Sequence, residues 1–219
     1  MNILFVSATE FEIEPLVREL RFVGMGGDRL KKYAYRNLNV DVLVTGLGMT
    51  ATAFYLGKFL NNGYDCSINI GLAGSFSADL EIGAVVNVVQ DCFSELGAED
   101  GDLFIPVAEM NLATENQETN LSRIKNTVLE NIPKVSGITV NTVHGNETSI
   151  DAAFGRFHPN VESMEGAAFL LACRLENIPC TQIRAISNLV EKRNRAAWKI
   201  PLAIEALNKK AHEILNAFP

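Results

Sequence analysis

The sequence predicts an α/β protein, a three-layer α/β/α sandwich around a central mixed, mostly parallel sheet. Short runs rich in Val and Ile alternate with segments of helical periodicity along the chain. The runs are apolar on both faces, as expected of strands that are covered by helices on either side. A chain of 219 residues is long enough for one well-cored domain. We therefore expect residues 1–219 to form a single domain.

Five segments are predicted to be strands, and each is a short apolar run. They are Ile3–Val6, Val40–Thr45, Ser67–Gly71, Ala84–Val89 and Thr181–Ser187. Ligands of such folds bind beyond the carboxyl ends of the strands. The residues that follow each strand are therefore the candidates for a functional site.

Four helices are predicted from apolar residues that recur at spacings of three and four. They cover residues 13–20, 53–60, 167–175 and 204–215, and Pro201 is tolerated near the first turn of the last helix. The polar stretch 95–119 lacks such a pattern and is expected to be loop-rich. Long irregular segments of this kind are often binding loops or contact surfaces.

Composition excludes several classes of function. A net charge of −7 argues against a nucleic-acid partner, which would require clustered Lys and Arg. No apolar run reaches the ~18 residues of a membrane span, and the N-terminus lacks a basic segment. The four cysteines have no CxxC spacing, which favours buried reduced thiols and a cytoplasmic location. The three histidines show no ligand spacing, so we expect no metal, and the chemistry predicted below needs no cofactor.

Two glycine-rich segments follow predicted strands. Gly46-Leu-Gly48-Met-Thr-Ala51 is close to the dinucleotide-binding pattern, but the acidic residue at the right distance, Asp65, precedes its strand instead of following it. The alternative is that these glycines bring the backbone and a helix N-terminus close to a ligand or to another strand. In the second segment, Ala73 and Gly74 belong to a run of small residues that forms either a backbone shelf for a flat ligand or a tight exit from the strand.

Three polar residues stand at predicted strand ends, and each has a structural alternative. Glu12 begins the first helix, where a charge is favoured by the helix dipole. Glu165 stands where a further short strand enters a helix, and it precedes Gly-Ala-Ala. It could therefore lie over a cavity, accept hydrogen bonds from two ribose hydroxyls and stabilise an oxocarbenium ion. It could equally be a helix N-terminal charge. Asn188 either caps a turn or binds a planar heterocycle.

Taken together, these segments resemble the nucleoside phosphorylase/nucleosidase superfamily over residues 1–217. The resemblance lies in the order and spacing of Ala-x-Glu-x-Glu ending at Glu12, the shelf 69–74, Met164-Glu165 and Arg184-Ala-Ile-Ser187. Within the superfamily, segments 95–101, 144–147, 162–168 and 187–201 are most similar to the futalosine hydrolase subfamily of menaquinone biosynthesis. The resemblance implies cleavage of the glycosidic bond of a small purine nucleoside.

The resemblance also implies roles for single residues. Glu12 would activate water for attack at C1′, and Glu165 would hold the ribose hydroxyls while Met164 packs on the sugar. Ser163 replaces a second sugar-binding glutamate found in many nucleosidases. Asn188 replaces the aspartic acid that protonates N7 in adenine-specific nucleosidases, which favours a 6-oxopurine base.

Phosphorylases of the superfamily carry arginines at the first loop and at the shelf. Here these positions hold Ser7-Ala-Thr-Glu-Phe and Asn69, so water is the expected nucleophile instead of phosphate. A futalosine substrate carries a benzoate on its 5′ side, for which Arg193 and Arg195 are candidates, although solvated loop charges are the alternative. Phe104 is a candidate cover for the 5′ group.

The family commonly assembles as dimers or larger homo-oligomers, and we expect the same here. Two alternatives for the function stay open. One is an adenine-type nucleosidase acting on methylthioadenosine or adenosylhomocysteine. The other is a protein that binds purine nucleosides without cleaving them.

Overall fold

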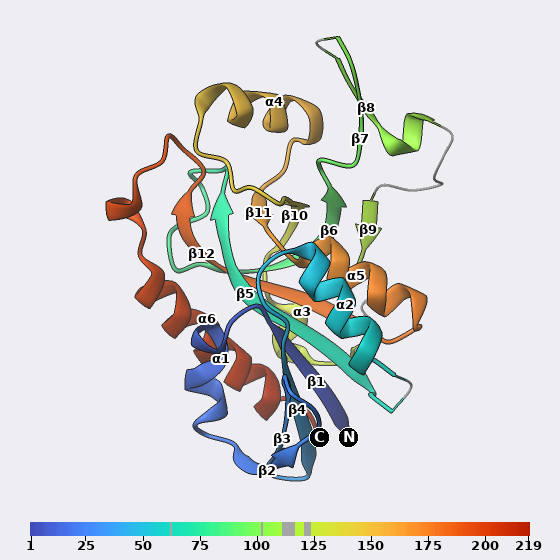
Figure 1. Cartoon of the computed structure of the whole chain (residues 1–219). Coiled ribbons are helices and arrows are strands. Elements are labelled where there is room, and N and C mark those ends of the chain that lie inside the picture. Colours follow the sequence, from blue (N-terminus) through green and yellow to red (C-terminus); the bar gives the residue numbers. More distant parts are fainter. Residues whose placement is uncertain (62, 102, 111–116, 121–123) are drawn as a thin grey trace.

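A computed structural model describes residues 1–61, 63–101, 103–110, 117–120 and 124–219 of the chain (Figure 1). The strands are β1 (Asn2–Ser7), β2 (Arg21–Met25), β3 (Leu30–Tyr35), β4 (Leu38–Val44), β5 (Cys66–Ser75), β6 (Val85–Phe93), β7 (Gly97–Asp100), β8 (Leu103–Pro106), β9 (Gln117–Thr119), β10 (Lys134–Thr139), β11 (Val161–Ser163) and β12 (Cys180–Leu189). The α-helices are α1 (Glu10–Val17), α2 (Met49–Phe59), α3 (Thr127–Glu130), α4 (Glu147–Phe157), α5 (Gly166–Leu175) and α6 (Ile200–Asn216). Two 3₁₀ helices, η1 (Val107–Met110) and η2 (Arg195–Ala197), complete the elements.

The centre of the large sheet is parallel and runs in the order β12-β5-β1-β4. Antiparallel β3 and β2 extend it beyond β4. On the other side β6 pairs antiparallel to β12, and β10 and β11 follow in parallel. The sheet is therefore mixed, as predicted, and the carboxyl ends of its central strands meet at one edge.

The far end of the sheet curls back on its centre. β11 pairs with β10 and also, antiparallel, with the end of β5, where Glu162 lies opposite Gly74. The strands β5, β12, β6, β10 and β11 thus close into a ring. This closure brings a carboxylate of β11 directly beside the predicted glycine shelf.

Helices cover both faces of the sheet, which confirms the predicted three-layer sandwich (Figure 1). Side chains of β1 alternate between the layers because successive strand residues point to opposite faces. Ile3 and Phe5 pack in the cluster that contains Leu16 of α1 and Leu207 of α6. Leu4 and Val6 pack on the opposite face in a second cluster, with α2 and α5. Apolar side chains on both faces of this strand are thereby explained.

The polar stretch 95–119 is more ordered than expected. β7 and β8 form an antiparallel hairpin within it, and β9 pairs with β6. Residues 102 and 111–116 of this stretch lie outside the described residues. The hairpin is stabilised by Phe104, whose ring lies 4.6 Å from the guanidinium carbon of Arg156 and 6.4 Å from the ring of Phe157, both on α4.

None of the helices that the structure describes has the length and apolar character needed to cross a membrane. The four cysteines are buried and free of disulfides, as their spacing predicts.

Candidate active site

A cavity of about 220 Å³ opens at the carboxyl edge of the sheet. Its wall combines the start of α1, the end of β5, the junction of β11 with α5, and the end of β12. The predicted site residues on this wall are Glu12, Ala73, Gly74, Ser163, Met164, Glu165 and Asn188. Residues more than 170 positions apart in the sequence therefore surround one space.

Glu12 is fixed by backbone and hydroxyl donors. Its Oε2 accepts hydrogen bonds from the backbone N of Thr9 at 3.0 Å, from the hydroxyl of Thr9 at 2.9 Å and from the hydroxyl of Ser7 at 3.3 Å. Its Oε1 accepts from the backbone N of Leu72 in β5 at 3.2 Å. With Thr9 it forms a capping box that begins α1, so the structural alternative for this residue is confirmed, and its catalytic role stays a prediction. The cap holds the carboxylate against the glycine shelf.

Glu165 is the N-cap residue of α5 and is only 9% exposed. Its Oε1 accepts a hydrogen bond of 2.9 Å from the backbone N of Gly48, which has a φ of 88° and precedes α2. The backbone of the Gly46–Gly48 segment thus approaches a side chain at the start of helix α5, and not another strand. Burial raises the pKa of Glu165, and the charge of Arg184 and the Gly48 N–H oppose that rise.

Arg184 is a buried cation, and the sequence pattern around it did not indicate a role for its charge in the site. It is 1% exposed, and it donates to Asn69 Oδ1 and to the carbonyl oxygen of Ile183. A Cβ placed on Gly71 would lie 3.2 Å from Glu12 Oε1 and 3.4 Å from Arg184 Nη1, so both groups converge on this glycine. Desolvation lowers the pKa of Arg184, and the surrounding carboxylates counteract it. The guanidinium is therefore a fixed counter-charge behind the cavity.

Asn188 and Ser163 differ in how many of their hydrogen-bonding groups already have partners within the protein. Asn188 Oδ1 accepts from the hydroxyl of Ser187 at 2.8 Å, and its Nδ2 donates to the carbonyl oxygen of Leu189 at 2.8 Å. One N–H of the amide stays available to a ligand. Ser163 is 5% exposed, and its hydroxyl has no hydrogen-bond partner among the described residues. Both side chains line the cavity with unused polar capacity.

His144, to which the sequence assigned no role, also lines the cavity. Its Nδ1 lies 2.6 Å from Glu162 Oε2, and its backbone N donates to Glu162 Oε1 at 3.0 Å. Neither residue belongs to a ligand-spaced motif, and they are 18 positions apart. The resemblance of segments 144–147 and 162–168 to one subfamily was the only signal in the sequence that pointed to them.

Three predicted residues lie outside the cavity wall. Arg193 and Arg195 are exposed, although the guanidinium carbon of Arg193 lies 5.6 Å from the ring of Trp198, which does line the cavity. Phe104 packs on α4 as described above. Their suggested contact with a 5′ substituent stays a prediction.

A buried polar network fixes the start of α5 and so the position of Glu165. Asp91 accepts hydrogen bonds from Thr139 at 2.9 Å and from Gln182 at 3.0 Å, and the Thr139 hydroxyl accepts from the backbone N of Ala167 at 2.8 Å. Burial raises the pKa of Asp91 to about 6. A Cβ on Gly166 would lie 2.1 Å from Gln182 Nε2 and 2.2 Å from Asp91 Oδ2, so only glycine fits there.

We expect Gly166→Ala to lower the free energy of unfolding by about 3 kcal/mol, because overpacking here displaces a fully buried network. Urea unfolding measures the change. Gly155→Ala is the matched control, since a Cβ at this exposed position in α4 meets nothing within 4 Å and alanine should stabilise the helix by up to about 1 kcal/mol. Equal stabilities for the two variants would contradict the role of Gly166.

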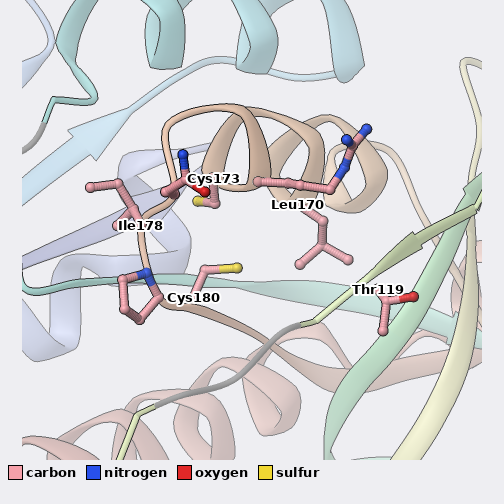
Figure 2. Close-up of a pocket in the computed structure, with 8 residues that line it drawn as sticks. Thr119, Leu170, Cys173, Ile178 and Cys180 are labelled. Carbon is pink, nitrogen blue, oxygen red and sulfur yellow. The ribbon is translucent and has the colours of Figure 1, made fainter.

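A second cavity, of about 90 Å³, lies at the opposite end of α5 (Figure 2). Cys173 and Cys180 line it together with Leu170 and Ile178. Burial raises the pKa of the Cys173 thiol well above its usual value, which makes it a poor nucleophile. The carboxylates required by the predicted chemistry line the first cavity, which is therefore the candidate active site.

The family model of the phosphorylase superfamily matches residues 2–218. The chain belongs to the phosphorylase superfamily. A futalosine hydrolase from Streptomyces coelicolor is 30% identical over 177 residues, which cover 76% of this chain and 74% of that protein. A 5′-methylthioadenosine/S-adenosylhomocysteine nucleosidase from Glaesserella parasuis is 26% identical and covers 100% of both chains. The predicted superfamily is thus confirmed.

Solved structures of the phosphorylase superfamily share the fold. Futalosine hydrolase of Helicobacter pylori superposes with a TM-score of 0.80 at 17% identity, covering 100% of this chain and 98% of that one. The 5′-methylthioadenosine/S-adenosylhomocysteine nucleosidase of the same organism, with butyl-thio-DADMe-Immucillin-A, gives a TM-score of 0.80 at 16% identity and covers 99% of that chain. At these identities the likeness establishes the architecture alone.

Proposed function

We propose that this protein hydrolyses the N-glycosidic bond of a purine nucleoside, with futalosine as the substrate and hypoxanthine and dehypoxanthine futalosine as the products. The observation that carries the proposal is the meeting of two carboxylates, Glu12 and Glu165, at one cavity with a backbone shelf. The similarity to futalosine hydrolases of Streptomyces coelicolor and Acidothermus cellulolyticus supports futalosine as the nucleoside.

In this mechanism the two carboxylates have different tasks. Glu12, held against Leu72 of the shelf, takes a proton from water as its oxygen attacks C1′. Glu165 accepts hydrogen bonds from the ribose hydroxyls, and its charge stabilises the oxocarbenium ion that develops at C1′. Met164 packs on the sugar, and the partnerless hydroxyl of Ser163 is free to bond it. Ala73 and Gly74 let the substrate lie against the backbone.

Hydrolysis is favoured over phosphorolysis by the charge of the site. Arg184 is a fixed, buried cation close to the carboxylates of the site. However, Glu12, Glu165 and Asp91 all act on its guanidinium, so its positive charge is already shared among carboxylates. A dianionic phosphate would meet net negative charge beside Glu12. Water avoids this repulsion.

The base preference depends on Asn188. Its remaining N–H can bond N7 or O6 of hypoxanthine, but an amide delivers no proton to the leaving base. Arg193, stacked on Trp198 near the cavity, is the better placed of the two arginines for a 5′ carboxylate. We further propose that residues 1–219 act as one domain in a cytoplasmic homo-oligomer without metal or cofactor, and that Phe104 of a second copy could cover the 5′ group.

The competing function is an adenine-type nucleosidase. It is favoured by the full-length match to the Glaesserella parasuis nucleosidase, which covers 100% of this chain. Asn188 opposes it, because this amide stands where adenine-specific nucleosidases carry the aspartic acid that protonates N7.

A substrate panel tests the proposal. Purified protein is incubated with futalosine, inosine and methylthioadenosine, without and with phosphate, and the released base and sugar are identified. We expect hypoxanthine from futalosine and no sugar 1-phosphate. Adenine as the preferred product would establish the competing function, and ribose 1-phosphate from inosine would contradict hydrolysis. Saturable binding without any product would indicate a binding protein.

A further inference from the structure

The His144–Glu162 pair is built like an oriented acid–base group. Both oxygens of Glu162 are used by one residue, the ring Nδ1 of His144 at 2.6 Å and its backbone N at 3.0 Å. Glu162 is 4% exposed, so the pair is shielded from water on the carboxylate side. The geometry makes Nδ1 a donor to the carboxylate and directs Nε2 away from it.

The edge of the His144 ring that does not bond Glu162 faces the cavity. The side chain of His144 is 15% exposed and lines the cavity, and Nε2 has no hydrogen-bond partner among the described residues. Phe76 packs edge-on against the imidazole, with ring centroids 6.3 Å apart. The ring is thus held by two neighbours while one nitrogen stays available to a ligand.

The pair lies at a different part of the shelf from Glu12, the proposed general base. A Cβ on Gly74 would lie 3.2 Å from Asn188 Nδ2 and 3.6 Å from Glu162 Cγ, whereas one on Gly71 would meet Glu12 and Arg184. The proposed water-activating group and the proposed base-binding amide therefore stand three residues apart along β5. Glu162, and with it His144, stands on the Asn188 side.

We propose that His144, oriented by Glu162, is the general acid that protonates the departing purine. This inference rests on the proposed nucleoside hydrolysis. It supplies the proton that Asn188 cannot deliver. Asn188 then recognises the base through its free N–H, and His144 donates the proton from Nε2.

The proposed step is balanced. The bond between C1′ and N9 breaks and its electron pair stays on the purine, which takes the proton from His144 Nε2. The oxygen of water forms the new bond to C1′, and Glu12 takes the proton that this water loses. Solvent then reprotonates His144 and removes the proton from Glu12, so the net reaction consumes one water.

The charges around the imidazole favour its protonated form. The hydrogen bond to Glu162 raises the pKa of His144, burial opposes this, and the charges of Glu162 and Glu95 add to the rise. Glu12 and Glu165 are the other charged residues on the cavity wall. Arg193 contacts the adjoining Gly145 through its backbone while its guanidinium lies at Trp198. The acid form of His144 therefore persists to higher pH than that of a free imidazole, and activity should fall as the pH rises through the raised pKa.

His144→Gln is the first test, because Gln keeps an N–H donor but has no transferable proton. We expect kcat for inosine or futalosine to fall by about 10²–10⁴-fold, the usual effect of losing a general acid, and the alkaline limb of the pH–rate profile to disappear. Hydrolysis of 7-methylinosine, whose base leaves without protonation, should change by less than about threefold relative to wild type. His158→Asn is the control, since His158 is exposed at the left-handed end of α4, where Asn is tolerated.

Glu162→Gln is the second test, because it removes the carboxylate charge while its amide oxygen can still accept from one of the two N–H groups of His144. Without the carboxylate charge the pKa of His144 falls, so the alkaline limb should move to lower pH. Glu118→Gln, at a buried glutamate paired with Arg174 outside the cavity, should leave the profile unchanged. A His144→Gln variant that retains the wild-type alkaline limb overturns the proposal, as does a Glu162→Gln variant with an unshifted limb. If the wild-type protein cleaves no nucleoside, the proposed function itself fails instead.

Discussion

Glu12→Gln is expected to lower kcat for nucleoside hydrolysis by about 10³-fold and to leave KM within about threefold of wild type. Gln cannot accept the proton of the attacking water, but it retains the shape of the side chain. Its amide oxygen can still accept from the backbone N of Leu72 or of Thr9. Steady-state rates with futalosine or inosine measure the effect.

The same carboxylate also caps α1, so stability must be measured in parallel. Losing part of the capping box is worth about 1 kcal/mol, a loss seen as a lower Tm and not as a thousandfold loss of rate in folded protein. Glu14→Gln is the matched control, because Glu14 is an exposed residue of the same helix whose partner is Arg18. A Glu12→Gln variant with more than a tenth of wild-type kcat would refute the general-base role.

The central strands were predictable because burial on both faces makes their sequences apolar throughout, and the helices against them because one apolar stripe recurs at helical spacing. The β2–β3 hairpin was not, since Phe22, Val23 and Met25 are exposed large hydrophobic residues and give no clean alternation. Helix α4 was also missed, although Ile150, Ala153, Phe154 and Phe157 recur at helical spacing. Of its residues only Ala153 is buried, so this stripe does not belong to the central core.

The positions of the candidate site residues at strand ends were predictable one at a time, but their hydrogen-bond partners were not. The bond from the Gly48 N–H to Glu165 joins residues 117 positions apart, and it depends on where α2 begins relative to α5. The ring closure that sets Glu162 opposite Gly74 depends on an antiparallel pairing of three-residue β11, too short to show periodicity. Such contacts are products of topology and leave no local pattern.

A structural role for a residue does not exclude the functional role that is proposed for it. Glu12 is a helix cap and a cavity carboxylate, and Glu165 is an N-cap residue whose side chain bonds another helix's start. A prediction that treats a capping role and a functional role as mutually exclusive leaves one of the two out. The capping box fixes the rotamer of the Glu12 side chain, and the proposed proton transfer requires such a fixed carboxylate.

Glu165→Gln should lower kcat/KM for inosine by about 10²–10³-fold. The charge-assisted hydrogen bonds to the ribose hydroxyls are worth about 1.5–3 kcal/mol each. The charge that stabilises the oxocarbenium ion is lost as well. The variant keeps an acceptor for the Gly48 N–H, so the hydrogen bond between the starts of α2 and α5 is retained. Glu118→Gln again serves as the buried control outside the cavity.

A substrate that lacks the ribose 2′-hydroxyl distinguishes a loss of ribose binding from a general disturbance of the site. On 2′-deoxyinosine the wild-type enzyme has already lost one partner of Glu165, so the additional loss in Glu165→Gln should be about tenfold smaller than on inosine. The pH profile gives an independent measure. Because burial raises the pKa of Glu165, kcat/KM of the wild type should fall as acid protonates this carboxylate, and the variant should lack that contribution. Equal losses on both substrates would mean that Glu165 supports the fold of the site without holding the 2′-hydroxyl.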